Sequence, residues 1–334
     1  MDVASFCRQS RVLVVAGKGG VGKTTVTAAL ARMAAHAGLS VLIVELEGKG
    51  GVMAAFGRSG SLDYEETLLH DGAGEVRARR ITPDDALLEY LADHGMKRIS
   101  KRLVSSGALD VVATAIPGIR DILVLGKVKS LERGEVADLI LVDAPATGHA
   151  MTFLSSARGL LDAARAGPVR AQAADVVELL TDPARSQVAL VTLPEEMPVN
   201  EVVEAAFTLE DRIGVTLGPV VVNGCLPDEP ALDRDPAEAA AEAGVGLDPA
   251  TSQALAAAAS FQRHRFALQE GQLGRLAEEL PLPQLRTRFL NDAVVGPEQL
   301  EVLAEDLASG VAALPDEPRR TSLHDERQQA VGEP

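Results

Sequence analysis

A glycine-rich segment near the N-terminus has the residue types and spacing of a phosphate-binding loop. Residues 17–24 read Gly-Lys-Gly-Gly-Val-Gly-Lys-Thr, which fits the pattern G-x-x-x-x-G-K-[ST]. Glycines permit positive φ angles and let backbone N–H groups close around a phosphate. Lys23 can reach the β- and γ-phosphates, and the Thr24 hydroxyl can bind Mg²⁺. The alternative is a glycine-rich turn without a ligand. The predicted nucleotide-binding residues are Gly17, Lys18, Gly19, Gly20, Val21, Gly22, Lys23, Thr24 and Thr25.

A second candidate for chemistry is Asp143, which directly follows the buried apolar run Leu139–Val142. An aspartate that closes a strand beside a phosphate loop can hold a water molecule bound to Mg²⁺. We therefore predict that Thr24 and Asp143 are the metal ligands. Lys23 and Asp143 are also predicted to take part in catalysis.

Two motifs resemble a known family. The K-G-G-V-G-K-T-T form, with Lys18 directly after the first glycine, resembles the deviant Walker A loop of the ParA/MinD and arsenite-pump class of dimeric ATPases. The segment from Asp143 to His149, followed by Phe153-Leu154, resembles the D-T-A-P-T-G-H…F-L switch of arsenite-pump and tail-anchored-protein-targeting ATPases. ParA- and MinD-type proteins usually have D-x-P-P-G there. Ala144 and the order Pro145-Ala146 depart from the pattern. The sequence is thus similar to the ArsA-like ATPases.

This resemblance implies a dimeric enzyme that binds ATP and Mg²⁺. In the family, the extra lysine reaches the nucleotide of the opposite subunit, so Lys18 becomes a catalytic candidate; the plain alternative is a solvated surface lysine. Asn223, at the end of the run VVVN, lies where the family's asparagine contacts adenine. Pro117-Gly118-Ile119 and Pro194-Glu195 match weaker elements of the family in the right order.

The first switch of the family departs from its pattern here. The family has D-P-A-H-N after the second strand, and its aspartate is thought to orient the attacking water. Glu47 occupies that place in Glu-Gly-Lys-Gly-Gly, with Ala55-Phe56 matching further on. The added methylene displaces the carboxylate by about 1 Å, an error that can cost about 100-fold in rate. We predict that Glu47 is catalytic. Either the three glycines of this segment let the loop retreat and restore the geometry, or the subunit hydrolyses ATP slowly and relies on an active partner; a solvated loop acid is the plain alternative. Lys49 has no counterpart in the family.

The elements that must position these residues alternate along the chain. Apolar runs predict strands at 11–16, 41–46, 139–142, 188–193 and 217–222, and residues 24–38 predict the first helix. The expected fold is α/β, a doubly wound and mostly parallel sheet in a single P-loop domain spanning 1–314. We expect a helical insertion without strands at about 58–135, and a helical pair at about 233–280 on the sheet or beside the insertion. A disordered tail is expected at 315–334.

The amino-acid composition disfavours several classes of function. The 32 basic and 48 acidic residues give a net charge of −16, which disfavours binding to nucleic acid. The two cysteines, Cys7 and Cys225, cannot form a thiol cluster for arsenite or a CxxC zinc site. Apolar runs are of strand length only, so we expect a cytoplasmic protein without stable membrane insertion.

Three functions remain open at this point. The favoured one is a Mg²⁺–ATP-dependent dimeric switch, either a homodimer or a heterodimer with a paralogous ATPase, acting on an unidentified protein client. The second is a pseudo-ATPase subunit that holds nucleotide and serves an active paralogue. The third, a MinD-like membrane positioner, is disfavoured because the last twenty residues form no basic amphipathic helix.

Overall fold

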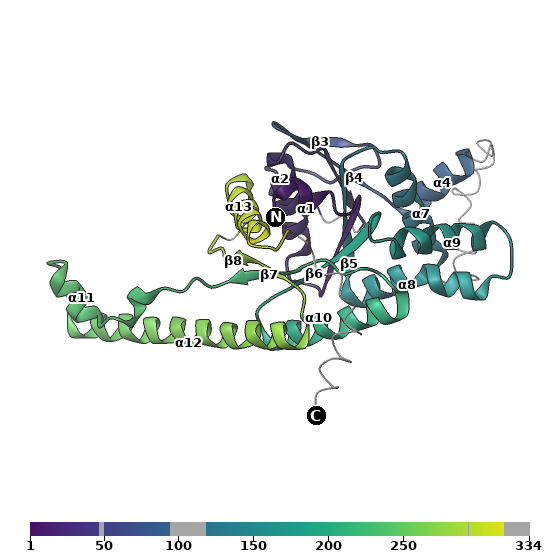
Figure 1. Cartoon of the computed structure of the whole chain (residues 1–334). Helices are drawn as coiled ribbons and strands as arrows, with labels where there is room; N and C mark the ends of the chain where they lie inside the picture. The colour runs from purple at the N-terminus through teal and green to yellow at the C-terminus, as the bar shows by residue number, and fades with distance from the viewer. Residues whose placement is uncertain (47–49, 94–117, 293, 317–334) are drawn as a thin grey trace, which may run out of the picture.

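The computed structural model describes residues 1–46, 50–93, 118–292 and 294–316. They form an eight-stranded sheet with the order β3-β4-β2-β5-β1-β6-β7-β8 (Figure 1). All neighbouring strands are parallel except the pair β3 and β4. The strands are β1 (Val12–Gly17), β2 (Val41–Glu45), β3 (Thr67–Asp71), β4 (Glu75–Arg80), β5 (Leu139–Ala146), β6 (Ser186–Thr192), β7 (Val220–Cys225) and β8 (Gln284–Arg288). The predicted doubly wound α/β fold is confirmed.

Helices cover both faces of this sheet. The described helices are α1 (Val3–Cys7), α2 (Lys23–His36), α3 (Gly51–Ala55), α4 (Pro83–Asp93), α7 (Ile119–Arg133), α8 (Thr147–Ala163), α9 (Pro168–Thr181), α10 (Glu196–Thr208), α11 (Pro236–Glu242), α12 (Pro249–Glu279) and α13 (Pro297–Ala312), with the short turns η1 (Leu209–Ile213) and η2 (Pro230–Asp233). Alternate strand residues face opposite sides: Val12 and Val14 join a core with α7 to α10, whereas Leu13 and Val15 join one with α1, α2 and α13. The strand β1, which leads into the phosphate loop, is therefore buried at the centre.

The expectation of no strand between residues 58 and 135 was wrong. Residues 67–80 form an antiparallel hairpin, β3 and β4, and β4 pairs with β2. The apolar signal was weak because only Val76 and Ala78 of β4 are apolar, and both are fully buried. Arg77 binds Glu66 at 2.5 Å from Nη1 to Oε2, and Arg79 lies over the ring of Tyr64. Residues 94–117 of the predicted insertion, with Pro117, lie outside the described residues.

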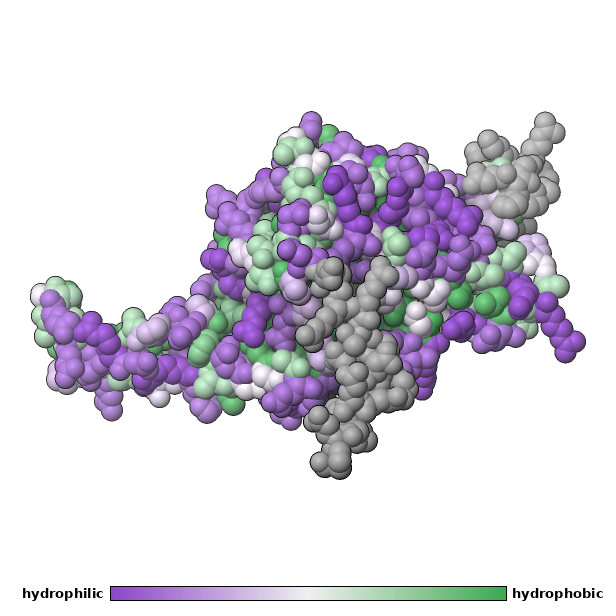
Figure 2. Space-filling view, in the orientation of Figure 1, coloured by the Kyte–Doolittle hydropathy of each residue, from purple (hydrophilic) through white to green (hydrophobic). Residues whose placement is uncertain are grey.

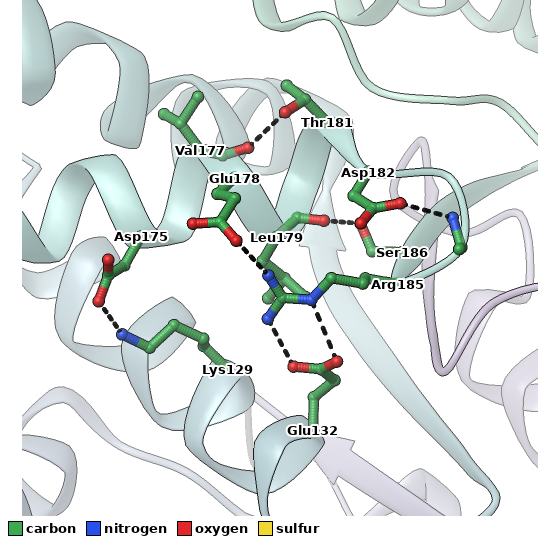
Figure 3. Close-up of polar contacts among 11 residues, drawn as sticks. Lys129, Glu132, Asp175, Val177, Glu178, Leu179, Thr181, Asp182, Arg185 and Ser186 are labelled. Atoms are coloured by element: carbon green, nitrogen blue, oxygen red, sulfur yellow. Dashed lines mark hydrogen bonds and ion pairs between the residues drawn. The ribbon is translucent and has the colours of Figure 1, made fainter.

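Ion pairs join α7 of the predicted insertion to α9 and to Arg185, which directly precedes β6 (Figure 3). Arg185 donates two hydrogen bonds to Glu132, at 2.6 Å from Nη2 and 3.1 Å from Nε, and the Glu132 side chain is 8% exposed. This carboxylate raises the pKa of Arg185. Lys129 donates to Asp175 at 2.5 Å and lowers the pKa of that carboxyl group. Because Glu132 is buried, removal of Arg185 would leave a carboxylate in the interior without its ion-pair partner.

Helix α11 and most of α12 do not pack on the sheet or the insertion as expected, whereas the C-terminal end of α12 joins the core. The 31 residues of α12 span about 46 Å, and most of this helix extends away from the body as an arm (Figure 1). Its alanine-rich sequence needs little packing to be helical, and the Asp248 side chain caps it by accepting from Ala250 and Thr251 N–H at 3.0 Å. Figure 2 shows mixed polar and apolar surface along the arm, where Leu255, Phe261 and Leu268 are exposed.

Burial differs along the arm, which predicts a contrast between two leucines of α12. Leu276 is fully buried in the core, whereas Leu255 is 46% exposed. We expect Leu276→Ala to lower the free energy of unfolding by about 2–5 kcal/mol, because a cavity forms. Leu255→Ala should change it by less than about 0.5 kcal/mol. Urea unfolding of both variants measures this, and equal losses would contradict the description of the arm.

Candidate functional site

The phosphate loop connects the central strand β1 to α2 and is confined by its neighbours. A Cβ on Gly17 would lie 2.3 Å from the carbonyl oxygen of Val191, so only glycine fits there. Gly20 and Gly22 have φ angles of +89° and +88°, in the left-handed region that favours glycine. Gly22 is also the N-cap of α2 and has no side chain to accept hydrogen bonds from the first N–H groups of the helix. These N–H groups and the helix dipole suit an anion.

Three predicted side chains lie together at the start of α2. Lys23 Nζ donates to the backbone carbonyl of Lys18 at 3.0 Å, so this side chain lies over its own loop. Thr24 Oγ1 donates to Asp143 Oδ2 at 2.7 Å, and Asp143 is 7% exposed. The contact follows from the sheet order, because β5 lies beside β1 with Asp143 opposite Val15. Thr25, the third residue of α2, is half-buried.

Lys18 is directed to a different element from Lys23. Its Nζ lies 2.5 Å from Oε1 of Glu201 on α10, and the two side chains are 40% and 33% exposed. This pair lies at a groove of about 470 Å³ between the loop, the start of α8 and α10. Gly19 also lines this groove, whereas Val21 is buried. Sequence analysis missed Glu201, because the 183 residues that separate it from Lys18 conceal the contact.

Asn223 on β7 also contacts the loop. Its Nδ2 donates to the carbonyl of Val21 at 3.0 Å, and its Oδ1 accepts from Thr287 Oγ1 on β8 at 2.8 Å. These bonds use one amide hydrogen and one oxygen lone pair, so an adenine edge would have to use the others. Thr287 was not recognised from the sequence, since a threonine in the short strand β8 carries no motif.

Comparisons of the sequence with known proteins show to which family this chain belongs. A family profile described as "Anion-transporting ATPase" matches residues 10–166 and 163–240. The chain is 36% identical to ATPase BagA of Mycobacterium tuberculosis over 273 residues, which cover 77% of each chain. The chain belongs to the ArsA-like family of anion-transporting ATPases. The resemblance expected from the two motifs is confirmed.

Two more distant relatives belong to the same group of ATPases. A protein named as an arsenical pump-driving ATPase of Halobacterium salinarum is 29% identical over 240 residues, covering 66% of this chain and 36% of that protein. The ATPase get3 of Neurospora crassa is 33% identical over 152 residues, covering 44% of this chain and 43% of that protein. The similarity to the second relative is thus confined to less than half of each protein.

The residues of this ArsA-like chain fit the magnesium ion that the family implies. The hydroxyl of Thr24 and the carboxylate of Asp143 are oxygen donors already within 2.7 Å of each other, at the N-terminus of the phosphate-loop helix. Mg²⁺ prefers one or two such protein oxygens together with phosphate oxygens and water. These two oxygen donors therefore fit Mg²⁺.

The predicted first switch lies partly outside the described residues, including both Glu47 and Lys49. Two positions earlier, Glu45 ends β2 with only 2% of its surface exposed, and it pairs in register with Asp143 of β5. The apolar run predicts Glu45 within a buried strand but gives no sign of its place beside Asp143. Of the second switch, the side chains of Thr147 and His149 are likewise not described.

Neither cysteine is suited to bind a soft metal at neutral pH. Burial raises the pKa of the Cys7 thiol to about 12 and that of Cys225 to about 11, so both remain protonated. Over the residues described, no cluster of three or more His, Cys, Asp and Glu side chains is arranged to hold a metal ion. In the same part of the chain, we find no helix with the length and apolar character needed to cross a membrane.

The two left-handed glycines of the loop should differ in their tolerance of alanine. A Cβ on Gly22 would lie 2.3 Å from Asn223 Nδ2, whereas a Cβ on Gly20 would meet nothing within 4 Å. Both substitutions strain the backbone by about 1–2 kcal/mol, but only Gly22→Ala also collides with a neighbour. We expect Gly22→Ala to weaken nucleotide binding at least about tenfold more than Gly20→Ala. Fluorescent-nucleotide titration of the two variants measures this; equal affinities would contradict the described loop.

Proposed function

We propose that the protein is a Mg²⁺–ATP-dependent dimeric switch of the ArsA-like class. The observation that carries the proposal is the meeting of Thr24, Asp143 and Lys23 at the phosphate loop, with Thr24 and Asp143 joined at 2.7 Å. The loop amides and Lys23 bind and orient the triphosphate, and Thr24 with Asp143 holds the metal. The metal ion, when bound, neutralises charge that develops on the transferred phosphoryl group.

Lys18 is assigned to the nucleotide of the opposite subunit. Support comes from its place at the groove beside α10, where it is partly exposed and paired with Glu201 rather than lying over its own loop as Lys23 does. To cross an interface, Lys18 must leave Glu201, and an exposed ion pair of this kind is weak, at about 0–1 kcal/mol. A cation delivered by the partner then stabilises the transition state.

The remaining predicted residues complete this scheme. Glu47 orients the attacking water, with the rate penalty that its longer side chain implies, and Asn223 contacts adenine through the donor and acceptor that its loop contacts leave. Hydrolysis rearranges the helical region around α4 and α7 and so changes affinity for a protein client. The dimer is formed by two copies of this chain or by this chain and a paralogous ATPase.

A mixing experiment tests whether Lys18 acts in trans. Lys18→Ala and Lys23→Ala should each abolish ATP turnover in a coupled phosphate-release assay. In a one-to-one mixture, about half of the dimers contain one chain of each variant, and each of these mixed dimers has one complete site out of two. About a quarter of wild-type turnover should therefore return. Recovery arises because the Lys23→Ala chain still donates Lys18 to the intact loop of its partner.

Two other outcomes decide against parts of this scheme. If the wild-type chain turns over ATP but the mixture shows no recovery, Lys18 serves its own subunit. If the wild-type chain binds ATP tightly without turnover, even at high protein concentration, the alternative of a nucleotide-holding pseudo-ATPase subunit is supported. The departure of Glu47 from the family aspartate is the specific observation that favours this alternative.

A further inference from the structure

Thr287 carries a hydroxyl group where the surrounding strand has no evident need of one. It lies on β8 with 1% of its surface exposed, between the charged residues Arg286 and Arg288. A valine has nearly the same shape and suits a buried strand, whereas a buried hydroxyl is unfavourable unless it is hydrogen-bonded. The Thr287 hydroxyl donates to Asn223 Oδ1 at 2.8 Å. The threonine is thus explained by its contact with Asn223.

This contact is one of two hydrogen bonds that hold the Asn223 amide in place. Since Oδ1 accepts from Thr287, Nδ2 is turned to the opposite side, where it donates to the carbonyl of Val21 at 3.0 Å. If the amide were reversed, an NH₂ group would face the hydroxyl and an oxygen would face the Val21 carbonyl, with two acceptors opposed. The Val21 carbonyl, which can only accept, therefore selects this orientation, and the hydroxyl of Thr287 anchors the oxygen end of the amide so that the Asn223 side chain stays within reach of the phosphate loop.

The bond from Asn223 fixes a peptide plane within the loop. The carbonyl of Val21 and the N–H of Gly22 belong to one planar trans peptide, so they point in opposite directions. This plane turns through ψ of Val21 and φ of Gly22, and Gly22, with a φ angle of +88°, offers little resistance to its rotation. Asn223 is close enough to Gly22 that a Cβ there would lie 2.3 Å from Nδ2. Holding the Val21 carbonyl toward Asn223 consequently directs the Gly22 N–H away from it.

We propose that Thr287 is a positioning residue for nucleotide binding, which orients Asn223 and so holds the Val21–Gly22 peptide with its N–H presented to a phosphate of the nucleotide. This inference rests on the proposed nucleotide site and adds a role for Asn223 besides its contact with adenine. The residues involved come from three separate segments, β7, β8 and the phosphate loop, which the sheet order brings together.

The test compares substitutions that differ in the hydroxyl alone. Thr287→Val keeps the shape and removes the donor, whereas Thr287→Ser keeps the donor. We expect Thr287→Val to weaken binding of both Mg²⁺–ATP and Mg²⁺–ADP by about 5- to 20-fold, the effect of losing one buried hydrogen bond. Thr287→Ser should remain within about twofold of wild type. Titration of the full-length variants with a fluorescent adenine nucleotide measures these affinities.

Controls separate positioning from a general loss of stability. Ser186→Ala removes another buried hydroxyl, which donates to the carbonyl of Leu179 at 2.9 Å. Ser186 is the first residue of β6 and pairs with Val12, at the opposite end of the strands from the phosphate loop. This variant should bind nucleotide as wild type does, even where its melting temperature falls. The double variant Asn223→Ala with Thr287→Val should bind no more weakly than Asn223→Ala alone, because Thr287 acts through Asn223.

Three results for the Thr287 variants would overturn the inference. The inference is overturned if Thr287→Val binds as wild type does, if Thr287→Ser binds as weakly as Thr287→Val, or if the double variant shows additive losses. Should Thr287→Val not fold, Thr287→Ala replaces it under the same criteria. If the wild-type protein binds no nucleotide, the proposed function fails and the inference with it. Where the wild type does bind, Lys23→Ala should lose binding, which shows that the assay can detect a loss and that an unchanged Thr287→Val is a true result.

Discussion

The tight approach of the phosphate loop to its neighbouring strands is the constraint on which the site depends. Gly17 has no room for a Cβ beside Val191 of β6, and Gly22 has none beside Asn223 of β7. A loop held this closely presents its N–H groups in one arrangement, and such preorganised donors need little rearrangement when charge develops on a phosphoryl group. The central place of β1 between β5 and β6 supplies this confinement.

The same sheet order brings the remaining functional groups to the loop. Strand β5 delivers Asp143 to Thr24, and β2 delivers the buried Glu45 to the same edge. On the other side, β7 and β8 deliver Asn223 and its partner Thr287. The base of the α12 arm contacts this side too, because Gln269 accepts from the N–H of Leu226 just after β7 at 2.8 Å. The arm and the loop are therefore attached to one strand.

Much of this arrangement could be predicted from the sequence, because the signals were local. The phosphate loop, the strand before it and the helix after it lie within one continuous stretch, and the apolar runs of β2, β5, β6 and β7 were long enough to recognise. The outer strands β4 and β8 could not be predicted: β4 has only two apolar residues, and β8 reads Gln-Leu-Arg-Thr-Arg. Their charged outer faces are satisfied by partners such as Glu66 and Asp306, which no local pattern reveals.

Contacts between distant segments were also beyond sequence reasoning. Lys18 was identified as a chemical candidate, but its partner Glu201 depends on how α10 packs beside the loop. Asn223 was identified through its family position, whereas its bonds to Val21 and Thr287 depend on the register of β7 and β8. The arm was predicted as helix from its alanine content, but its direction depends on packing at Leu273 and Leu276.

The most direct test of the central claim is the equilibrium binding of ATP with and without Mg²⁺, measured for the wild-type chain and Thr24→Val. The account predicts saturable binding to wild type that Mg²⁺ tightens by about tenfold or more, equivalent to about 1.4 kcal/mol. The valine variant should lose this gain, since the hydroxyl beside Asp143 is gone. Absence of saturable binding, or an equal gain from Mg²⁺ in both proteins, would contradict it.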